Sequence, residues 1–250
     1  MSAQLIVCGS SGSHPGPDAA GASLLLSVDG TDVLLDIGNG SLTNLMRFRD
    51  VADIDAIVLS HMHPDHFLDL YGFHHARVFH PTPDLPPVPV HAPRGAAETV
   101  ALLVDDTVRL HAGLPFHDLV TDRPFHVARL RFVPFGVSHP VPAFGVRVEA
   151  GATDMAYTGD TELTDDLVAH VRGADLLVAD ATWLEDHGPY PAGIHMTAAD
   201  VGRLADAAKV GKVLLTHIKP THDHEASAAE AARHFGGEIL VARDRLELDL

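Results

Sequence analysis

The 250-residue sequence is poor in several features that mark particular protein classes. Its one cysteine, Cys8, excludes an internal disulfide, and because Cys8 lies in an apolar run we interpret it as a small buried hydrophobe. No basic amino-terminal segment precedes an apolar stretch, and no apolar run approaches the roughly eighteen residues of a membrane helix. We therefore expect a soluble, cytoplasmic protein without membrane partners.

Positive charge is also scarce. Only 17 basic residues, three of them lysines, stand against 34 acidic residues, which gives a formal net charge of −17. Because affinity for nucleic acids comes largely from neutralised phosphates, this balance disfavours a long polyanionic partner such as tRNA. A small anionic substrate is not disfavoured, since a metal ion can dominate the field inside a pocket.

The apolar residues present, with a hydrophobic content of 46%, suffice for one sizeable core. Without repeats or low-complexity tracts, residues 1–250 are interpreted as a single domain. Strands first form a hairpin-rich block and later alternate with helices, which favours a layered α/β or α+β fold. Apolar runs predict strands near 4–8, 23–28, 32–37, 56–60, 88–91, 127–133, 144–149, 154–158, 175–179, 213–216 and 238–242. Periodicity predicts helices at 41–49, 65–78, 94–103, 163–172, 197–209 and 224–235, and the proline-rich stretch 80–89 predicts a loop.

The stretch SHMHPDHFLDL, residues 60–70, concentrates histidine and aspartate directly after the apolar run DAIVL. In a chain with 19 histidines this spacing arises by chance in roughly one case in a hundred. His61 and His63 alternate at a strand end, while Asp65 and His66 follow Pro64, which is well placed to open a helix. Imidazole and carboxylate donors suit zinc best, with manganese or iron as alternatives.

Three further residues of the same kind end predicted strands downstream. His139 ends FVPFGVSH, Asp160 ends MAYTGD and His217 ends VLLTH. A lone histidine at a strand end is more often an ordinary surface or core residue, but four stretches with the same pattern favour a shared metal site. If all of them contribute, the site is binuclear.

These motifs together resemble the metallo-β-lactamase-fold hydrolases over nearly the whole chain, through HxHxDH at 61–66, TGDT, LLTHIKP and the histidine at 139. The resemblance implies a four-layer αββα sandwich and a hydrolase that uses two divalent metal ions to activate a shared water. It assigns His61, His63 and His139 to one metal, Asp65, His66 and His217 to the other, and Asp160 to both as a bridge, with Asp65 also counted as catalytic.

The resemblance also narrows the reaction. Common zinc β-lactamases carry a cysteine where this chain has Asp160, which disfavours lactamase activity. GIHMTAAD and DATW are similar to elements of ribonuclease Z, which implies that His195 protonates the leaving oxygen and that Asp180 orients His195. Alternatively, His195 merely precedes a helix capped by Thr197, and Asp180 caps a turn.

Two other segments are expected near the site. Lys219, two residues after His217, either holds a phosphate oxygen or is a solvated loop lysine. The small-residue loop at 9–23 resembles a loop of the ribonuclease Z group and is expected to border the site.

Ribonuclease Z enzymes usually insert a long tRNA-gripping arm between the third and fourth ligand motifs, whereas only about twenty residues separate His139 from Asp160 here. The missing arm and the acidic charge favour a small phosphodiester substrate. CGSSG, SHMHPDHFLDL, AYTGDT and LLTHIKP are similar to motifs of bacterial atypical cyclic-nucleotide phosphodiesterases. A tRNA 3′-processing endonuclease, a thioester or lactone hydrolase and a non-catalytic metal-binding module stay open as alternatives, as does a homodimer.

Overall fold

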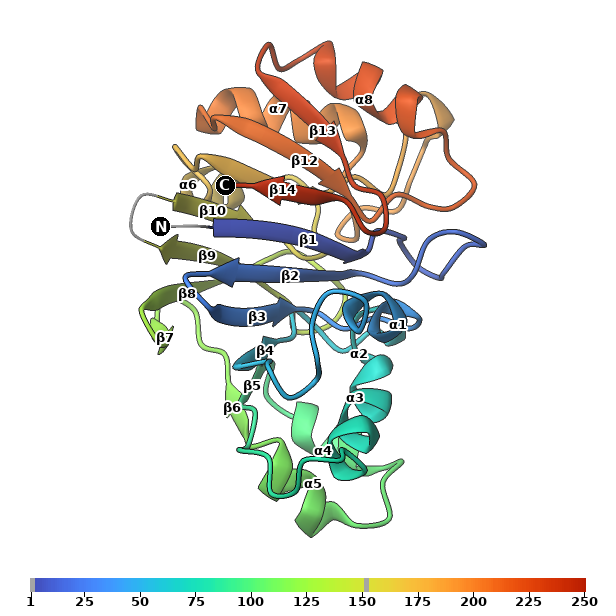
Figure 1. The fold of residues 1–250 in the computed structure, drawn as a ribbon. Helices are drawn as coiled ribbons and strands as arrows, with labels where there is room; N and C mark the ends of the chain where they lie inside the picture. Colours follow the sequence, from blue (N-terminus) through green and yellow to red (C-terminus); the bar gives the residue numbers. More distant parts are fainter. Residues whose placement is uncertain (1–2, 151–152) are drawn as a thin grey trace.

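Two seven-stranded sheets pack face to face in the computed structural model, which describes residues 3–150 and 153–250 (Figure 1). The first sheet has the order β14-β1-β2-β3-β4-β5-β6 and the second β13-β12-β11-β10-β9-β8-β7. The first sheet consists of β1 (Ala3–Gly9), β2 (Ser23–Val28), β3 (Thr31–Leu35), β4 (Ala56–Val58), β5 (Val90–Ala92), β6 (Phe116–Asp118) and β14 (Glu247–Asp249). The second consists of β7 (Phe125–Val127), β8 (Leu130–Gly136), β9 (Phe144–Ala150), β10 (Thr153–Tyr157), β11 (Leu176–Asp180), β12 (Lys212–Thr216) and β13 (Glu238–Val241).

Each sheet is antiparallel in one half and parallel in the other. β14, β1, β2 and β3 pair antiparallel, and β3 to β6 pair parallel. The second sheet repeats this arrangement, antiparallel from β7 to β10 and parallel from β10 to β13. Because parallel neighbours need long crossover connections, the parallel halves carry most of the helices.

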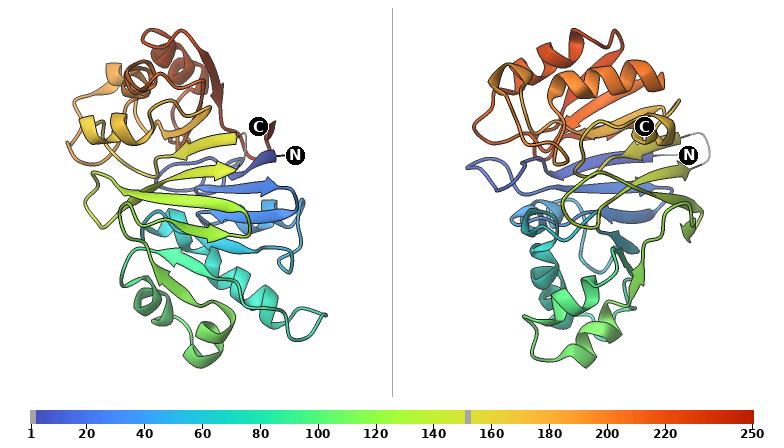
Figure 2. Two further views of the ribbon diagram at one scale, coloured as in Figure 1. Left: turned by 90° about the vertical axis from the view of Figure 1, so that its left-hand side faces the viewer. Right: turned by 180° about the vertical axis from the view of Figure 1, so that it is seen from behind.

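Helices cover both outer faces of the two sheets, as the views from other sides show (Figure 2). The first sheet is covered by α1 (Ser41–Leu45), α2 (Pro64–Phe67), α3 (Asp69–Val78), α4 (Ala96–Ala101) and α5 (Thr107–Gly113). The second is covered by α6 (Asp165–His170), α7 (Ala198–Ala208) and α8 (His224–Ala232), and a short 3-10 turn spans Glu185–His187. The four-layer αββα sandwich is therefore confirmed.

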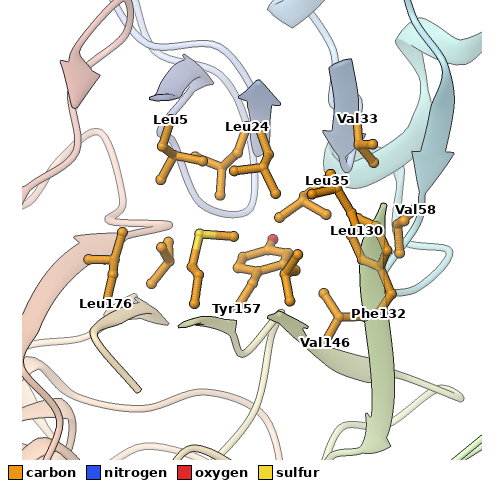
Figure 3. Close-up of a cluster of buried hydrophobic side chains, with 14 of the residues drawn as sticks. Leu5, Leu24, Val33, Leu35, Val58, Leu130, Phe132, Val146, Tyr157 and Leu176 are labelled. Atoms are coloured by element: carbon orange, nitrogen blue, oxygen red, sulfur yellow. The ribbon is translucent and has the colours of Figure 1, made fainter. Parts of the chain in front are cut away.

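The inner faces of the sheets supply the central core. Leu5, Leu24 and Val33 of the first sheet face Phe132, Val146 and Tyr157 of the second (Figure 3). Burying one such side chain is worth roughly 1.5–3 kcal/mol. This core holds the two sheets together and so fixes the loops at their edges.

Most expected elements are present, with some differences in extent. The expected strand at 127–133 is two strands, β7 and β8, because Ala128, at φ 50°, turns the chain back on itself. The short elements β6, β14 and α5 were not expected. Residues 80–89 form a loop, and Thr197 caps α7 in a capping box with Asp200, as predicted. Among the described residues, no helix is both long enough and apolar enough to cross a membrane.

Candidate metal centre and active site

Three imidazoles meet where the loops after β4 and β8 approach each other. His61 Nε2 lies 3.0 Å from His63 Nδ1, and His139 Nε2 lies 3.0 Å from the same nitrogen. His61 is fully buried, whereas His63 and His139 are half-buried. The three rings therefore direct nitrogen atoms at one point that opens toward solvent.

A second group lies beside the first. Pro64 opens α2, as predicted, and the helix presents Asp65 and His66. His217, which follows β12, approaches from the other sheet, with Nε2 3.1 Å from His66 Nε2 and 3.2 Å from Asp65 Oδ2. His217 adopts a left-handed backbone, φ 58°, which is uncommon for a non-glycine residue and directs the ring into the cluster.

Asp160 lies between the two groups. Its Oδ1 is 3.3 Å from His66 Nε2 and 3.4 Å from His217 Nε2, while its Oδ2 is 3.6 Å from His61 Nε2. The side chain is buried, and Oδ1 accepts no hydrogen bond from any described residue. A buried carboxylate oxygen without a donor is costly, so its position between imidazole nitrogens fits a cation at this point.

The first three histidines are held neutral. Burial, assisted by the neighbouring His66, lowers the pKa of His61 to about 2. Burial also lowers the pKa values of His63 and His139, although Asp160 opposes both shifts. Neutral imidazoles carry the lone pairs that a metal ion requires.

In the second group the pKa values of the histidines are raised instead of lowered. Burial opposes charge on His217, yet Asp160, Asp180 and Asp65 raise its pKa to about 10. Burial likewise opposes charge on His66, and Asp160 and Asp36 outweigh it, so that its pKa is raised. The histidines in turn outweigh burial and lower the pKa values of Asp160 and Asp65. The buried carboxylates thus favour a positive charge within the second group. The imidazole and carboxylate donors there fit a divalent metal ion.

A second ring nitrogen of three of these histidines, His66, His217 and His139, is fixed by another residue. His66 Nδ1 lies 2.8 Å from Asp36 Oδ2, and His217 Nδ1 lies 2.7 Å from Thr182 Oγ1. His139 Nδ1 donates to the carbonyl oxygen of Ile194 at 2.9 Å. Such partners fix the tautomer and leave Nε2 free for a metal ion.

Asp36 was missed in the sequence analysis. It is fully buried, accepts hydrogen bonds from the backbone N–H and hydroxyl of Ser60 at 2.7 Å each, and stands at φ 60°. The signal was available, because Asp36 ends the apolar run VLLD in the same way as Asp160 ends its own strand. Thr182 was missed as well, although it lies within DATW.

His195 and Asp180 are brought together at the edge of the cluster. His195 Nδ1 lies 2.8 Å from Asp180 Oδ2, and 3.7 Å from Asp160 Oδ2. Although burial opposes it, His195 lowers the pKa of Asp180, so this carboxylate stays ionised. Thr182 Oγ1 donates to the other Asp180 oxygen at 2.5 Å, which links Asp180 to His217 as well.

Trp183 connects His195 with Lys219. The indole meets the His195 ring edge-to-face at 5.1 Å, and Lys219 Nζ lies 5.9 Å from the centroid of an indole ring. Tyr190 stacks on Trp183 at 4.3 Å. Lys219, half-buried, is therefore near His195, while its contact with a substrate stays a prediction.

Two other contacts shape the site. Glu162 accepts hydrogen bonds from Ser138 Oγ at 2.8 Å and from the N–H of Gly193 at 2.7 Å, so it ties together the loops that carry His139 and His195. The small-residue loop packs on His217, as expected, since a Cβ atom at Gly12 would lie 2.2 Å from the His217 carbonyl oxygen. The structure thus gathers nine of the ten predicted site residues in the cluster and places the tenth, Lys219, at its border, while their individual roles stay predictions.

Comparisons of the sequence and of the structure with known proteins agree on one family. Residues 31–218 match the model of the beta-lactamase superfamily domain. The chain is 33% identical to the uncharacterized protein Rv1339 of Mycobacterium tuberculosis, covering 96% of this chain and 89% of that protein. It is 27% identical to ribonuclease Z of Halobacterium salinarum, covering 98% and 97%. The crystal structure of the metallo-beta-lactamase fold protein YhfI from Bacillus subtilis superposes with a TM-score of 0.91 at 24% identity, over 100% of both chains.

Proposed function

Because the chain belongs to the family of the beta-lactamase superfamily domain and is a metal-dependent hydrolase, we propose that it hydrolyses a phosphodiester bond. The substrate we propose is small, foremost a cyclic nucleotide. The observation that carries this proposal is the pairing of His195 with Asp180 beside the metal centre. A hydrolase that expels a sugar alkoxide needs a positioned acid, and this pair provides one.

Two divalent ions are part of the proposal. His61, His63 and His139 would hold one and Asp65, His66 and His217 the other, with one oxygen of Asp160 facing each group. When bound, the ions, zinc in preference to manganese or iron, supply electrophilic activation of the phosphoryl group and an activated water. Asp65, whose Oδ2 lies 3.2 Å from His217 Nε2, would serve the reaction as well as hold a metal ion.

His195 would act through Nε2. Its Nδ1 donates to the ionised Asp180, and Trp183 restricts the plane of the ring from the side. The fixed carboxylate compensates the charge of the doubly protonated ring, so that Nε2 can give its proton to the departing oxygen. Lys219, whose Nζ lies 5.9 Å from a ring centroid of Trp183, would hold a non-bridging phosphate oxygen.

A small substrate is favoured over tRNA by what this chain lacks. The interval between His139 and Asp160 is largely occupied by β9 and β10. The alignment with ribonuclease Z of Halobacterium salinarum extends over 302 positions, whereas this chain has 250 residues, so that enzyme carries segments absent here. The net charge of −17 adds repulsion against a polyanion.

The test compares two substrates with different leaving groups, in the wild type and in a variant that lacks the His195 side chain. Nitrophenolate needs little protonation, whereas a ribose alkoxide needs it in the transition state. His195→Ala should therefore slow hydrolysis of 3′,5′-cyclic AMP by about 10²–10⁴-fold and largely spare bis-(p-nitrophenyl) phosphate. The matched control is His187→Ala in the neighbouring 3-10 turn, where the ring contacts His222 and not Asp180.

Equal losses on both substrates, at unchanged metal content, would remove His195 from the mechanism. Parallel assays with precursor tRNA, lactones and thioesters decide between the substrate classes. Efficient cleavage of precursor tRNA with no activity on cyclic nucleotides would replace the small phosphodiester by a tRNA substrate.

A further inference from the structure

A cleft of about 300 Å³ lies in the helical layer that covers the first sheet, away from the metal centre. It is formed by the last turn of α3, the following proline-rich loop and α5, in the lower part of Figure 1. Ligand pockets in proteins begin at about this volume, which exceeds the space needed by inorganic phosphate alone.

Two arginines face this cleft, Arg77 from α3 and Arg109 from α5. Arg77 is held in place by the carbonyl oxygens of Val51 and Pro86, which leaves further N–H groups of its guanidinium unused. Arg109 is exposed, and its guanidinium makes one long contact, 3.5 Å, with the carbonyl oxygen of Val78. Among the described residues, neither guanidinium has a carboxylate within 4.0 Å. Asp50 acts on Arg77 only from beyond this distance, so both guanidiniums keep N–H groups that an anion could accept from.

A buried donor also lines the cleft. His74 is only 5% exposed and also lines the cleft. Burial, together with His75 and Arg109, lowers its pKa, whereas Asp106 opposes the shift. His74 is therefore neutral, and its ring carries one N–H group that can donate to a ligand.

Three acidic residues, Asp50, Asp84 and Asp106, lie at or beside the cleft, but among the described residues none forms an ion pair with either arginine. Asp84 lies on the exposed loop, and Asp106 uses its Oδ1 to cap α5 at the N–H of Arg109. His80 is already engaged by the N–H of Thr82 and by Asp50, so it adds no free donor. The unused N–H groups of the two guanidiniums thus favour an acceptor-rich ligand of negative charge.

We propose that this cleft binds a small phosphate monoester, with the phosphate between Arg77 and Arg109 and within reach of the His74 N–H. The fork of N–H groups on each guanidinium matches phosphate oxygens in geometry and charge. The space beyond a phosphate accommodates the organic part, which distinguishes a monoester from the free ion.

The test titrates the metal-loaded protein with adenosine 5′-monophosphate and with inorganic phosphate in a calorimeter. The metal centre also attracts phosphates, so the second site is identified by Arg109→Gln. This variant should weaken one class of sites by about ten- to a hundredfold, and adenosine 5′-monophosphate should bind there more tightly than phosphate. The matched control is Arg129→Gln, which removes an exposed arginine from the turn between β7 and β8.

Arg109→Gln should keep wild-type turnover of bis-(p-nitrophenyl) phosphate, which shows that the fold and the metal centre are intact. A single class of sites, or a second class that Arg109→Gln leaves unchanged, would overturn the proposal. Equal weakening by Arg129→Gln would reduce the effect to overall charge and overturn it too. Because binding is the readout, the result does not depend on which phosphodiester the enzyme cleaves.

Discussion

The hydroxyl of Tyr157 donates a 2.7 Å hydrogen bond to Oδ2 of Asp36, although Tyr157 ends β10 of the second sheet and Asp36 directly follows β3 of the first. Figure 3 shows the Tyr157 ring among the apolar side chains of the inter-sheet core. The same oxygen of Asp36 lies 2.8 Å from His66 Nδ1. Packing between the sheets is thereby coupled to the orientation of a predicted metal ligand.

Removing that hydroxyl should weaken both stability and metal binding. In Tyr157→Phe, the buried carboxylate of Asp36 loses one of its donors, which costs roughly 1.5–3 kcal/mol of unfolding free energy. Urea denaturation of the apoprotein measures this loss, and a metal titration should show a lower affinity. The matched control, Tyr190→Phe, loses a 2.9 Å hydrogen bond to the Leu184 carbonyl near the surface and should cost less than about 1 kcal/mol. Equal costs for both variants would contradict the coupling.

The position of Asp160 predicts how metal content responds to substitution. Its two oxygens face different histidine groups, so Asp160→Ala should lower the metal content at both positions. His217→Ala removes a donor from the group with Asp65 and His66, leaves the group of His61, His63 and His139 intact, and should mainly deplete the former position. Elemental analysis after dialysis measures both losses. A content of about two ions per chain in Asp160→Ala would refute the bridging role.

The salt dependence should differ between a small substrate and a large one. Hydrolysis of a cyclic nucleotide should change little between about 50 and 200 mM salt, because few phosphate charges are involved. Binding of precursor tRNA should be weak and should fall steeply over the same range, which a filter-binding titration measures. Site-specific cleavage of precursor tRNA that persists at the higher salt concentration would reverse this order of substrates.

His91 should make the protein sensitive to acid. Its ring stacks on Phe125 at 3.8 Å, and burial together with His117 lowers its pKa from 6.5 to about 4. Because the unfolded chain takes up this proton more readily, the contribution is fully present above about pH 6.5 and is lost as the pH falls toward 4. His91→Phe keeps a stacked ring and should remove on the order of 2 kcal/mol of the stability difference between pH 7 and pH 4.

Denaturant unfolding at a series of pH values measures the effect of His91→Phe. The apoprotein is used, so that loss of metal ions does not contribute. His126→Phe on the neighbouring strand β7 is the control, because that side chain is exposed and should not alter the slope. A pH dependence that is identical in wild type and His91→Phe would contradict the assignment to His91.

Those features of the site that residues close together in the sequence form could be predicted from the sequence. The spacing of His61, His63, Asp65 and His66, with Pro64 at the start of α2, requires only neighbouring residues to adopt strand-end and helical geometry. Strand ends marked His139, Asp160 and His217, and Thr197 marked the start of α7. These features follow from backbone propensity and apolar patterning, which act over a few residues. The resemblance to the family then implied the four-layer αββα arrangement.

Other distant contacts were decided by the tertiary structure alone. Asp36 and Tyr157 are 121 positions apart, and neither periodicity nor spacing relates them. The same holds for Arg77 and Arg109, whose α3 and α5 face one cleft only after the first sheet has assembled. The short elements α5, β6 and β14 carry too few residues for a periodic pattern, so packing against the sheets determines them. Patterns along a sequence fix which face of an element is buried, whereas the packing of the sheets determines what that face meets.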